Sequence, residues 1–246
     1  MSEGRAAGGG GEGGGGEGGG GSGARGGTGG DTAAPCRGHR HRLRVGLLGG
    51  SFNPAHAGHR HVAHLALRRL RLDQVWLLVS PGNPLKPARG MAPLAERLAS
   101  ARAVADGRRV VATGIEACLH TRYTHDTLRA LKRLFPRVRF VWLMGADNLA
   151  QLPRWQRWEG IARAMPFAVL PRPGYNGRAL AGRAARRLRP ALRPARQAPV
   201  LAARRAPAWT FLPAPQTAIS ATALRAARLG AMSHPPAHPP QQGPRP

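Results

Sequence analysis

The sequence predicts an α/β fold: a Rossmann-like, doubly wound parallel sheet in a single domain with disordered N- and C-terminal tails. Short apolar runs alternate with stretches of helical periodicity between residues 41 and 232. This alternation is typical of βαβ units joined by right-handed crossovers. The chain has 246 residues, which suits one such domain and its tails and is ample for a sizeable core.

The expected strands are short apolar runs bounded by turn residues. The first run ends in Gly49 and Gly50, and the second is followed directly by Ser80, Pro81 and Gly82. In chain order, the expected strands span residues 43–48, 75–79, 110–115, 138–144, 167–170 and 209–212.

The expected helices lie between and after these strands. Val62, Leu65 and Leu70 recur at helical spacing in the first of them. Pro93 is typical of a helix start, and Pro136 follows the end of another helix. In chain order, the expected helices span residues 57–70, 93–104, 124–134, 157–164 and 220–229.

Three segments have biased compositions. Residues 1–40 form an expected disordered tail, because the first 30 contain 18 of the 34 glycines. These glycines do not form a phosphate loop, which would need a strand before it and a helix after it. Residues 233–246, rich in Pro, Gln and His, form a second expected tail. Within the domain at 41–232, residues 172–208 are rich in Arg, Ala and Pro; we favour a variable, solvated surface there over an RNA-binding arm.

The charge is strongly basic, with 38 Lys and Arg against 11 Asp and Glu. Nearly all of these cations are Arg, and Arg, Ala, Gly and Pro have GC-rich codons, so part of the charge is expected to reflect genome composition rather than a polyanionic partner. No apolar run approaches the roughly 18 residues of a membrane span, and the Gly-rich N-terminus has no signal-peptide pattern. Two cysteines are too few for a disulfide framework or a zinc site, so we expect a cytoplasmic protein.

The segment from Gly49 to His59 carries the clearest chemical signal. It follows the first strand directly, and ligands of open α/β sheets bind beyond the carboxyl ends of the strands. Glycines there let the backbone approach a phosphate, while the next helix offers unpaired N–H groups. His56 and His59 lie three residues apart, on one face of that helix start, where imidazoles can donate hydrogen bonds to an anion. Ordinary surface histidines are the alternative in a chain with ten of them.

The sequence GGSFNPAHAGH at residues 49–59 resembles the signature of the HxGH nucleotidylyltransferase superfamily, and specifically of the bacterial nicotinate-nucleotide adenylyltransferases. The resemblance runs from about residue 44 to about residue 228. It is supported by SPGNPLK at 80–86, TRYTHDTL at 121–128, MGADNL and PRW within 144–155, and ISATALR at 219–225. Asn53 departs from the family, where Asp is commoner; Asn keeps the turn-forming side chain and loses the charge.

The resemblance implies an enzyme of NAD biosynthesis. It would transfer AMP from ATP to nicotinate mononucleotide, giving deamido-NAD and pyrophosphate by direct in-line attack without a covalent intermediate. A phosphate nucleophile is already ionised, so catalysis needs alignment and charge neutralisation more than a general base. Mg²⁺ would arrive with ATP, held by phosphate oxygens and water, and no metal site is expected in the protein. The expected partners are the two nucleotides, without a membrane or a nucleic acid.

Site residues follow from the matching motifs. Catalysis is assigned to His56, His59 and Arg225. The resemblance and the turn chemistry place ATP against Gly50, Ser51, Phe52, His56, His59, Lys86, Gly145, Asp147, Ile219, Ser220, Thr222 and Arg225. Nicotinate mononucleotide is expected against Ser51, Tyr123, Thr124 and Trp155.

Several of these residues also have a residue-level argument. Ser220 is a good N-cap, and Thr222 and Arg225 share one face of the helix that follows it. Lys86 is a compact cation in a chain that uses Arg almost everywhere, although it can also be an ordinary surface residue. Asp147 can accept from ribose hydroxyls, or can instead form an Asx turn or a helix cap.

Two alternatives stay open. One is an adenylyltransferase of the same fold that prefers nicotinamide mononucleotide; a phosphopantetheine adenylyltransferase fits less well, because it is shorter and reads TxGH. The other is an RNA-binding protein on a degenerate core, suggested by the net charge of +27. The intact HxGH and ISxTxxR motifs argue against degeneracy.

Overall fold

The computed structural model describes residues 42–82 and 90–214. The predicted tails and the predicted site residues Lys86, Ile219, Ser220, Thr222 and Arg225 lie outside the described residues. No helix within the described residues is long and apolar enough to cross a membrane.

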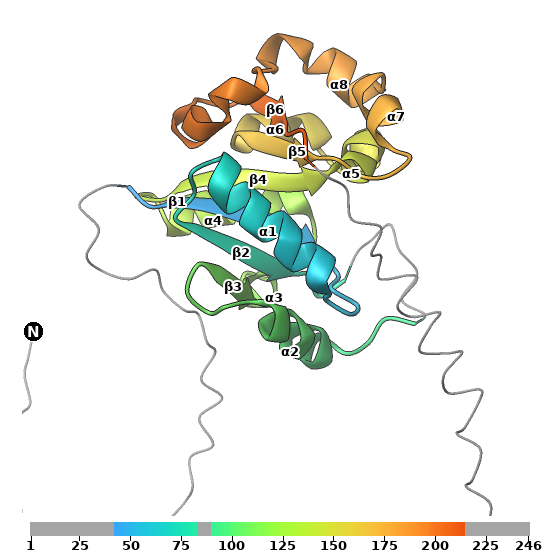
Figure 1. The fold of residues 1–246 in the computed structure, drawn as a ribbon. Helices are drawn as coiled ribbons and strands as arrows, with labels where there is room; N and C mark the ends of the chain where they lie inside the picture. The colour runs from blue at the N-terminus through green and yellow to red at the C-terminus, as the bar shows by residue number, and fades with distance from the viewer. Residues whose placement is uncertain (1–41, 83–89, 215–246) are drawn as a thin grey trace, which may run out of the picture. The chain divides into compact units, whose positions relative to one another are not determined.

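A parallel six-stranded sheet forms the centre of the fold, in the order β3-β2-β1-β4-β5-β6 (Figure 1). This confirms the predicted Rossmann-like sheet. The strands are β1 (Arg44–Gly50), β2 (Gln74–Val79), β3 (Val110–Thr113), β4 (Arg139–Gly145), β5 (Phe167–Leu170) and β6 (Trp209–Phe211). The order reverses between β1 and β4, and crossovers on either side of that point diverge, which opens a crevice at the carboxyl ends of these two strands.

The helices cover both faces of the sheet. They are α1 (Ala57–Arg69), α2 (Leu94–Val104), α3 (Ile115–Cys118), α4 (Thr124–Leu134), α5 (Ala146–Gln151), α6 (Trp158–Ala164), α7 (Asn176–Leu180) and α8 (Arg183–Arg187). The described residues also contain three 3-10 helices: η1 (Leu152–Arg154), η2 (Arg189–Ala191) and η3 (Ala195–Ala203). The third strand is shorter than predicted, because Gly114 follows Thr113 and α3 begins at the next residue.

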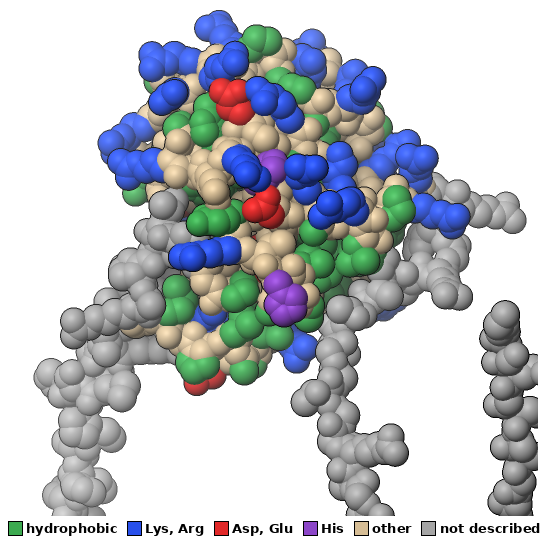
Figure 2. All heavy atoms as spheres, turned by 180° about the vertical axis from the view of Figure 1, so that it is seen from behind, with side chains coloured by type: hydrophobic (Ala, Val, Ile, Leu, Met, Phe, Trp, Pro, Cys, Tyr) green, Lys and Arg blue, Asp and Glu red, His purple; other side chains and the backbone are tan. Residues whose placement is uncertain are grey.

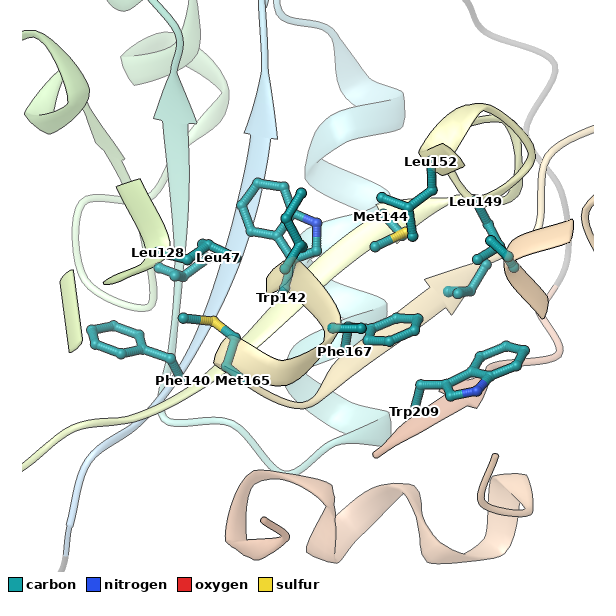
Figure 3. Close-up of a cluster of buried hydrophobic side chains, with 14 of the residues drawn as sticks. Leu47, Leu128, Phe140, Trp142, Met144, Leu149, Leu152, Met165, Phe167 and Trp209 are labelled. Atoms are coloured by element: carbon teal, nitrogen blue, oxygen red, sulfur yellow. The ribbon is translucent and has the colours of Figure 1, made fainter. Parts of the chain in front are cut away.

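Alternation along the strands divides the buried side chains between two cores. In β4, Phe140, Trp142 and Met144 belong to one core (Figure 3), whereas Val141 and Leu143 belong to the other. Successive side chains of a strand point to opposite faces, so a strand that is apolar throughout needs cover on both. Figure 1 shows this cover, with α1 in front of the sheet and α4 behind it.

The Arg-rich segment 172–208 is folded onto the sheet rather than looped out from it. Its small apolar side chains are buried, among them Ala179, Ala184, Ala198 and Leu201. Most of its arginines are exposed, and Figure 2 shows Lys and Arg side chains spread over much of one face of the molecule. The predicted solvated surface therefore describes the arginines of this segment, while its alanines contribute to both cores.

The edge strand β6 ties this segment to the sheet. The ring of Trp209 stacks on Phe167 of β5, with centroids 5.5 Å apart and planes 6° from parallel (Figure 3). The Trp209 indole N–H donates to the Leu188 carbonyl at 2.8 Å, which satisfies a polar atom that would be costly to bury alone.

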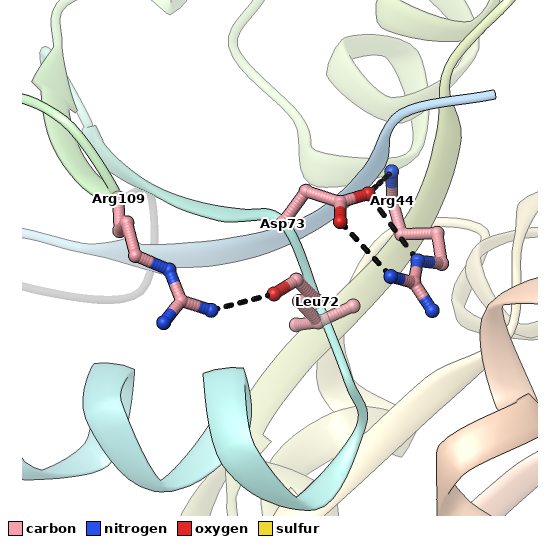
Figure 4. Close-up of polar contacts among 4 residues, drawn as sticks. All are labelled: Arg44, Leu72, Asp73 and Arg109. Carbon is pink, nitrogen blue, oxygen red and sulfur yellow. Dashed lines mark hydrogen bonds and ion pairs between the residues drawn. The ribbon is translucent and has the colours of Figure 1, made fainter. Parts of the chain in front are cut away.

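Polar contacts fix the end of the sheet at which β1, β2 and β3 begin (Figure 4). Arg44 donates from Nη2 to Asp73 Oδ1 at 2.9 Å and from Nε to Asp73 Oδ2 at 3.2 Å, a bidentate pair of the kind that fixes geometry. Arg109 donates to the Leu72 carbonyl at 3.0 Å. The amino ends of β1, β2 and β3 are thus held by protein contacts, which leaves the carboxyl ends for a ligand.

Replacement of Gly49 by Ala should destabilise the fold, because the added Cβ would lie 2.5 Å from Cη2 of Trp142. We expect a loss of about 1–3 kcal/mol in the free energy of unfolding, measured by urea denaturation. Trp142→Phe should recover part of that loss in a double-mutant cycle. The control is Gly177→Ala in α7, whose Cβ would meet nothing within 4 Å. If the changes in unfolding free energy caused by Gly49→Ala and Trp142→Phe simply add, the predicted clash is contradicted.

Candidate active site

A cavity of about 460 Å³ opens at the carboxyl ends of β1, β2 and β4. This volume is in the range of small-ligand sites. Six of the predicted site residues line it: Gly50, Ser51, Tyr123, Thr124, Asp147 and Trp155. Residues more than a hundred positions apart in the sequence, such as Gly50 and Trp155, therefore meet at the carboxyl end of the strands, as the strand order requires.

A smaller hollow is lined by two more of the predicted residues, whereas His56 and Phe52 line neither hollow. His59 and Gly145 line it, together with Arg172, which follows β5. Arg172 also reaches the main cavity, because its Nε lies 3.6 Å from Oδ1 of the cavity residue Asp147. The predicted phosphate turn and the predicted ribose contact thus belong to one connected region.

The two histidines form a reciprocal cap at the start of α1. The Gly58 amide donates to Nδ1 of His56 at 3.1 Å, and the His56 amide donates to Nδ1 of His59 at 3.2 Å. An Nδ1 atom that accepts a hydrogen bond carries no proton, so this pattern assigns the proton of each neutral ring to Nε2. Both imidazoles keep an Nε2–H donor for a ligand.

Burial favours the neutral form of both rings. The pKa of His59 is lowered from 6.5 to about 3, mainly by burial and then by the charges of His56 and Arg172; a backbone contact with His56 opposes this shift only in part. The pKa of His56 is also lowered, again by burial first and by Arg172 second. Hence at neutral pH the free protein presents two uncharged hydrogen-bond donors, while the positive charge nearby belongs to Arg172.

The turn that leads into these histidines has a strained conformation. Phe52 has φ of 47°, a left-handed value that is unfavourable for a bulky side chain. Its ring is buried, 2% exposed, and lies 4.9 Å from the His59 ring. The predicted contact from Phe52 can therefore come from its backbone, because its side chain supports His59 from within the core.

Asp147 has an unmet hydrogen-bonding capacity. It lies in the first turn of α5, and its Oδ1 is buried and has no hydrogen-bond donor among the residues that the structure describes. The alternative role as a helix cap is not seen, since Gly145 is the N-cap of α5 and no side chain caps that helix. Gly145 has no room for a side chain, because an added Cβ would collide with Asp147 Oδ1. A buried carboxylate oxygen of this kind favours a ligand hydroxyl as its partner.

The opposite wall of the cavity combines a flat ring with a helix start. Trp155 lies at the C-cap of η1 and is partly buried. The helix α4 begins at Thr124, after Tyr123, without a side-chain cap. An uncapped helix start offers N–H groups and a partial positive charge to a carboxylate, and an indole face suits an electron-poor ring.

Three further residues are placed here by the structure and were missed in the sequence. Glu116 and Trp142 line the main cavity, and Arg172 links the two hollows. Burial raises the pKa of the Glu116 carboxyl, although hydrogen bonds with the Ser80 and Thr127 hydroxyls partly oppose that rise. The position of Glu116, three residues after a strand in a chain poor in acids, was a usable signal.

The free energy of unfolding should fall as pH drops below 6.5. Between pH 6.5 and about 3, His59 is protonated in the unfolded chain and neutral in the folded chain. The free energy of unfolding therefore falls by about 1.4 kcal/mol for each pH unit of acidification. Denaturant melts across this range should show a shallower slope for His59→Asn than for the unchanged chain. His64→Asn, on the same helix, is the control, and equal slopes for all three chains would contradict the assignment.

Comparison with known proteins places this site in a family. The model of the cytidylyltransferase-like family matches residues 47–227. The probable nicotinate-nucleotide adenylyltransferase of Gluconobacter oxydans is 65% identical over 183 residues, 74% of this chain and 94% of the relative. That of Gluconacetobacter diazotrophicus is 60% identical over 201 residues, 82% of this chain and 94% of the relative.

Solved structures support the fold independently. The nicotinic acid mononucleotide adenylyltransferase of Plasmodium falciparum, solved with NaAD, superposes with a TM-score of 0.56 at 16% identity, covering 75% of this chain and 83% of that one. The similarity at this identity concerns the fold alone. The sequence relatives and the family model together show that this chain belongs to the nicotinate-nucleotide adenylyltransferases of the cytidylyltransferase-like family.

Proposed function

We propose that this chain transfers the adenylyl group of ATP to nicotinate mononucleotide, producing deamido-NAD and pyrophosphate in NAD biosynthesis. The observation that carries the proposal is the pair of Nε2–H donors at the start of α1, the helix after β1, whose carboxyl end lines a cavity with a ribose-type acceptor and an aromatic wall. Relatives that bear this activity in their names align over 74% to 82% of the chain.

The chemical step needs no base from the protein. An oxygen of the mononucleotide phosphate forms a bond to the α-phosphorus of ATP, the bond from that phosphorus to the bridging oxygen breaks, and pyrophosphate leaves with the electron pair. The nucleophile is already an anion, so His56 and His59 act as donors to the phosphate oxygens. ATP enters as its magnesium complex, with the ion held by phosphate oxygens and water.

Each substrate has a proposed part of the site. The ribose of ATP donates to Asp147, whose Oδ1 has no hydrogen-bond donor within residues 42–82 and 90–214, while Arg172 adds positive charge beside the phosphates. The nicotinate ring stacks on Trp155, and its carboxylate faces the uncapped start of α4 at Thr124. An amide at the same position gains less from that positive helix end, which favours nicotinate over nicotinamide.

The substrate preference can be tested by supplying the protein with ATP, Mg²⁺ and either mononucleotide, and by measuring pyrophosphate release. We expect nicotinate mononucleotide to give the higher kcat/KM, because a carboxylate gains more than an amide from the helix start. A higher kcat/KM for the amide would overturn the substrate. Steep, salt-sensitive RNA binding without pyrophosphate release would instead support the RNA-binding alternative.

Replacement of His59 by Ala should lower kcat by about a hundredfold to a thousandfold, as expected when a donor to the transition state is lost. His64→Ala, further along the same helix, serves as the matched control and should retain nearly full turnover. Near-normal turnover of the His59 variant, with a circular dichroism spectrum like that of the unchanged chain, would refute the proposed role.

A further inference from the structure

Arg97 is a buried cation that none of the family motifs includes. It lies in α2 and is 2% exposed. Within the described residues its guanidinium donates to four backbone carbonyl oxygens and to no carboxylate: Nε to Ala92 at 2.8 Å, Nη1 to Ser51 at 2.9 Å and to Ser80 at 2.6 Å, and Nη2 to Pro81 at 3.1 Å. Burial of a cation without an anion is costly, so its retention calls for a function.

Three of the four carbonyls belong to segments that border the active site. Ser51 is in the turn after β1, while Ser80 and Pro81 follow β2, so Arg97 joins the carboxyl ends of two neighbouring strands. Ser51 and Ser80 both line the main cavity. The planar guanidinium reaches three directions at once, which a Lys ammonium at the end of a flexible chain does not reproduce.

The same face of α2 holds the next part of the turn. Ser100 lies three residues after Arg97, and its hydroxyl accepts from the Ala55 amide at 3.1 Å. Its one hydrogen is shared between the Arg97 carbonyl at 2.9 Å and the Phe52 carbonyl at 3.3 Å. These contacts bracket Phe52, the residue with the left-handed backbone. Such a conformation persists only where the surroundings determine it. The contacts with Ser51, Phe52 and Ala55 supply that determination.

The segment before α2 completes this support. Asn53 donates from Nδ2 to the Gly90 carbonyl at 2.8 Å and accepts at Oδ1 from the Ala92 amide at 3.3 Å. Since Arg97 Nε also binds Ala92, the turn and its support share one hydrogen-bonded unit. This arrangement explains how Asn53 serves in a position where the family more often has Asp, because its amide donor is used.

We propose that Arg97 is a positioning residue for adenylyl transfer. It joins the turn at residues 51–55 and the Ser80–Pro81 segment into one rigid wall, and that wall sets where His56 and His59 present their Nε2–H donors. Its buried positive charge, behind the turn, also favours the anionic phosphates in front of it. This inference rests on the proposed function, since the positioned histidines act on the substrates named there.

Arg97→Met and Arg97→Lys test this role. Met removes the charge and the four hydrogen bonds while keeping much of the buried volume, and Lys keeps the charge without the fork. We expect Arg97→Met to raise KM for ATP and lower kcat, with kcat/KM reduced by about a hundredfold, as expected for a misplaced catalytic group. Arg97→Lys should stay closer to the Met variant than to the unchanged chain.

Two controls separate positioning from general loss of stability and charge. Leu72→Ala, buried at the opposite edge of the sheet, lowers the melting temperature without touching the site. Arg68→Met removes an exposed charge from α1. Both should keep KM for ATP near that of the unchanged chain. Ser100→Ala is a milder variant, expected to fold and to raise KM for ATP several-fold through the same turn.

A readout independent of activity distinguishes this proposal from the proposed function. Hydrogen exchange of the amides at residues 51–55 and 80–82 should accelerate in Arg97→Met, and less so in Leu72→Ala at matched melting temperature. If the wild-type protein itself shows no adenylyl transfer, the proposed function is overturned, but the exchange measurement still tests the positioning role. The positioning role is overturned if Arg97→Met or Arg97→Lys matches the unchanged chain in KM and kcat, or if a loss in Arg97→Met is equalled by Leu72→Ala.

Discussion

The turn between β1 and α1 is the constraint on which the rest of the site depends. The His56 amide donates to Nδ1 of His59, and the Gly58 amide donates to Nδ1 of His56. The side chains that cap the helix are therefore the same side chains that we propose as donors to the phosphates. A change in the turn would release the cap and misdirect the donors together, so the local fold and the chemistry are a single interaction.

The parallel sheet makes this turn useful by bringing other loops to it. The strand order puts β4 next to β1, so Asp147 at the start of α5 lies at the same edge as the histidine turn. The ion pair of Arg44 and Asp73 fixes the amino ends of β1 and β2 at the other end of the sheet. A binding scaffold needs rigid contacts at one end of the strands. At the other end it needs loops with unmet hydrogen-bonding capacity.

Local patterns made part of this architecture predictable from sequence. The histidine pair follows from a spacing of three residues, and the strands follow from apolar runs that the two cores explain, as in β4 around Trp142. The short helix α3 was not foreseen, because four residues carry too little periodicity. The alanines of residues 172–208 were assigned to the surface since their arginine neighbours dominate the pattern, although Ala184 and Ala185 are buried.

Contacts between distant segments were beyond such patterns. Arg97 looks like one more arginine of a basic chain, and only the fold brings it to a carbonyl 46 residues away, at Ser51. Trp142 and Glu116 likewise become cavity residues only when β4 and α3 take their places. Composition did not single these residues out, because the property that matters is burial against a particular partner.

The distribution of charge gives the site its final logic. Substrates with several phosphates need positive charge, yet the two histidines are held neutral by burial and by their caps. In the proposed mechanism the charge comes from two guanidinium groups: Arg172, which lines the smaller hollow with His59, and Arg97, behind the turn. In the same proposed mechanism, neutral donors at fixed positions align the phosphates, and the guanidinium groups around them neutralise the charge.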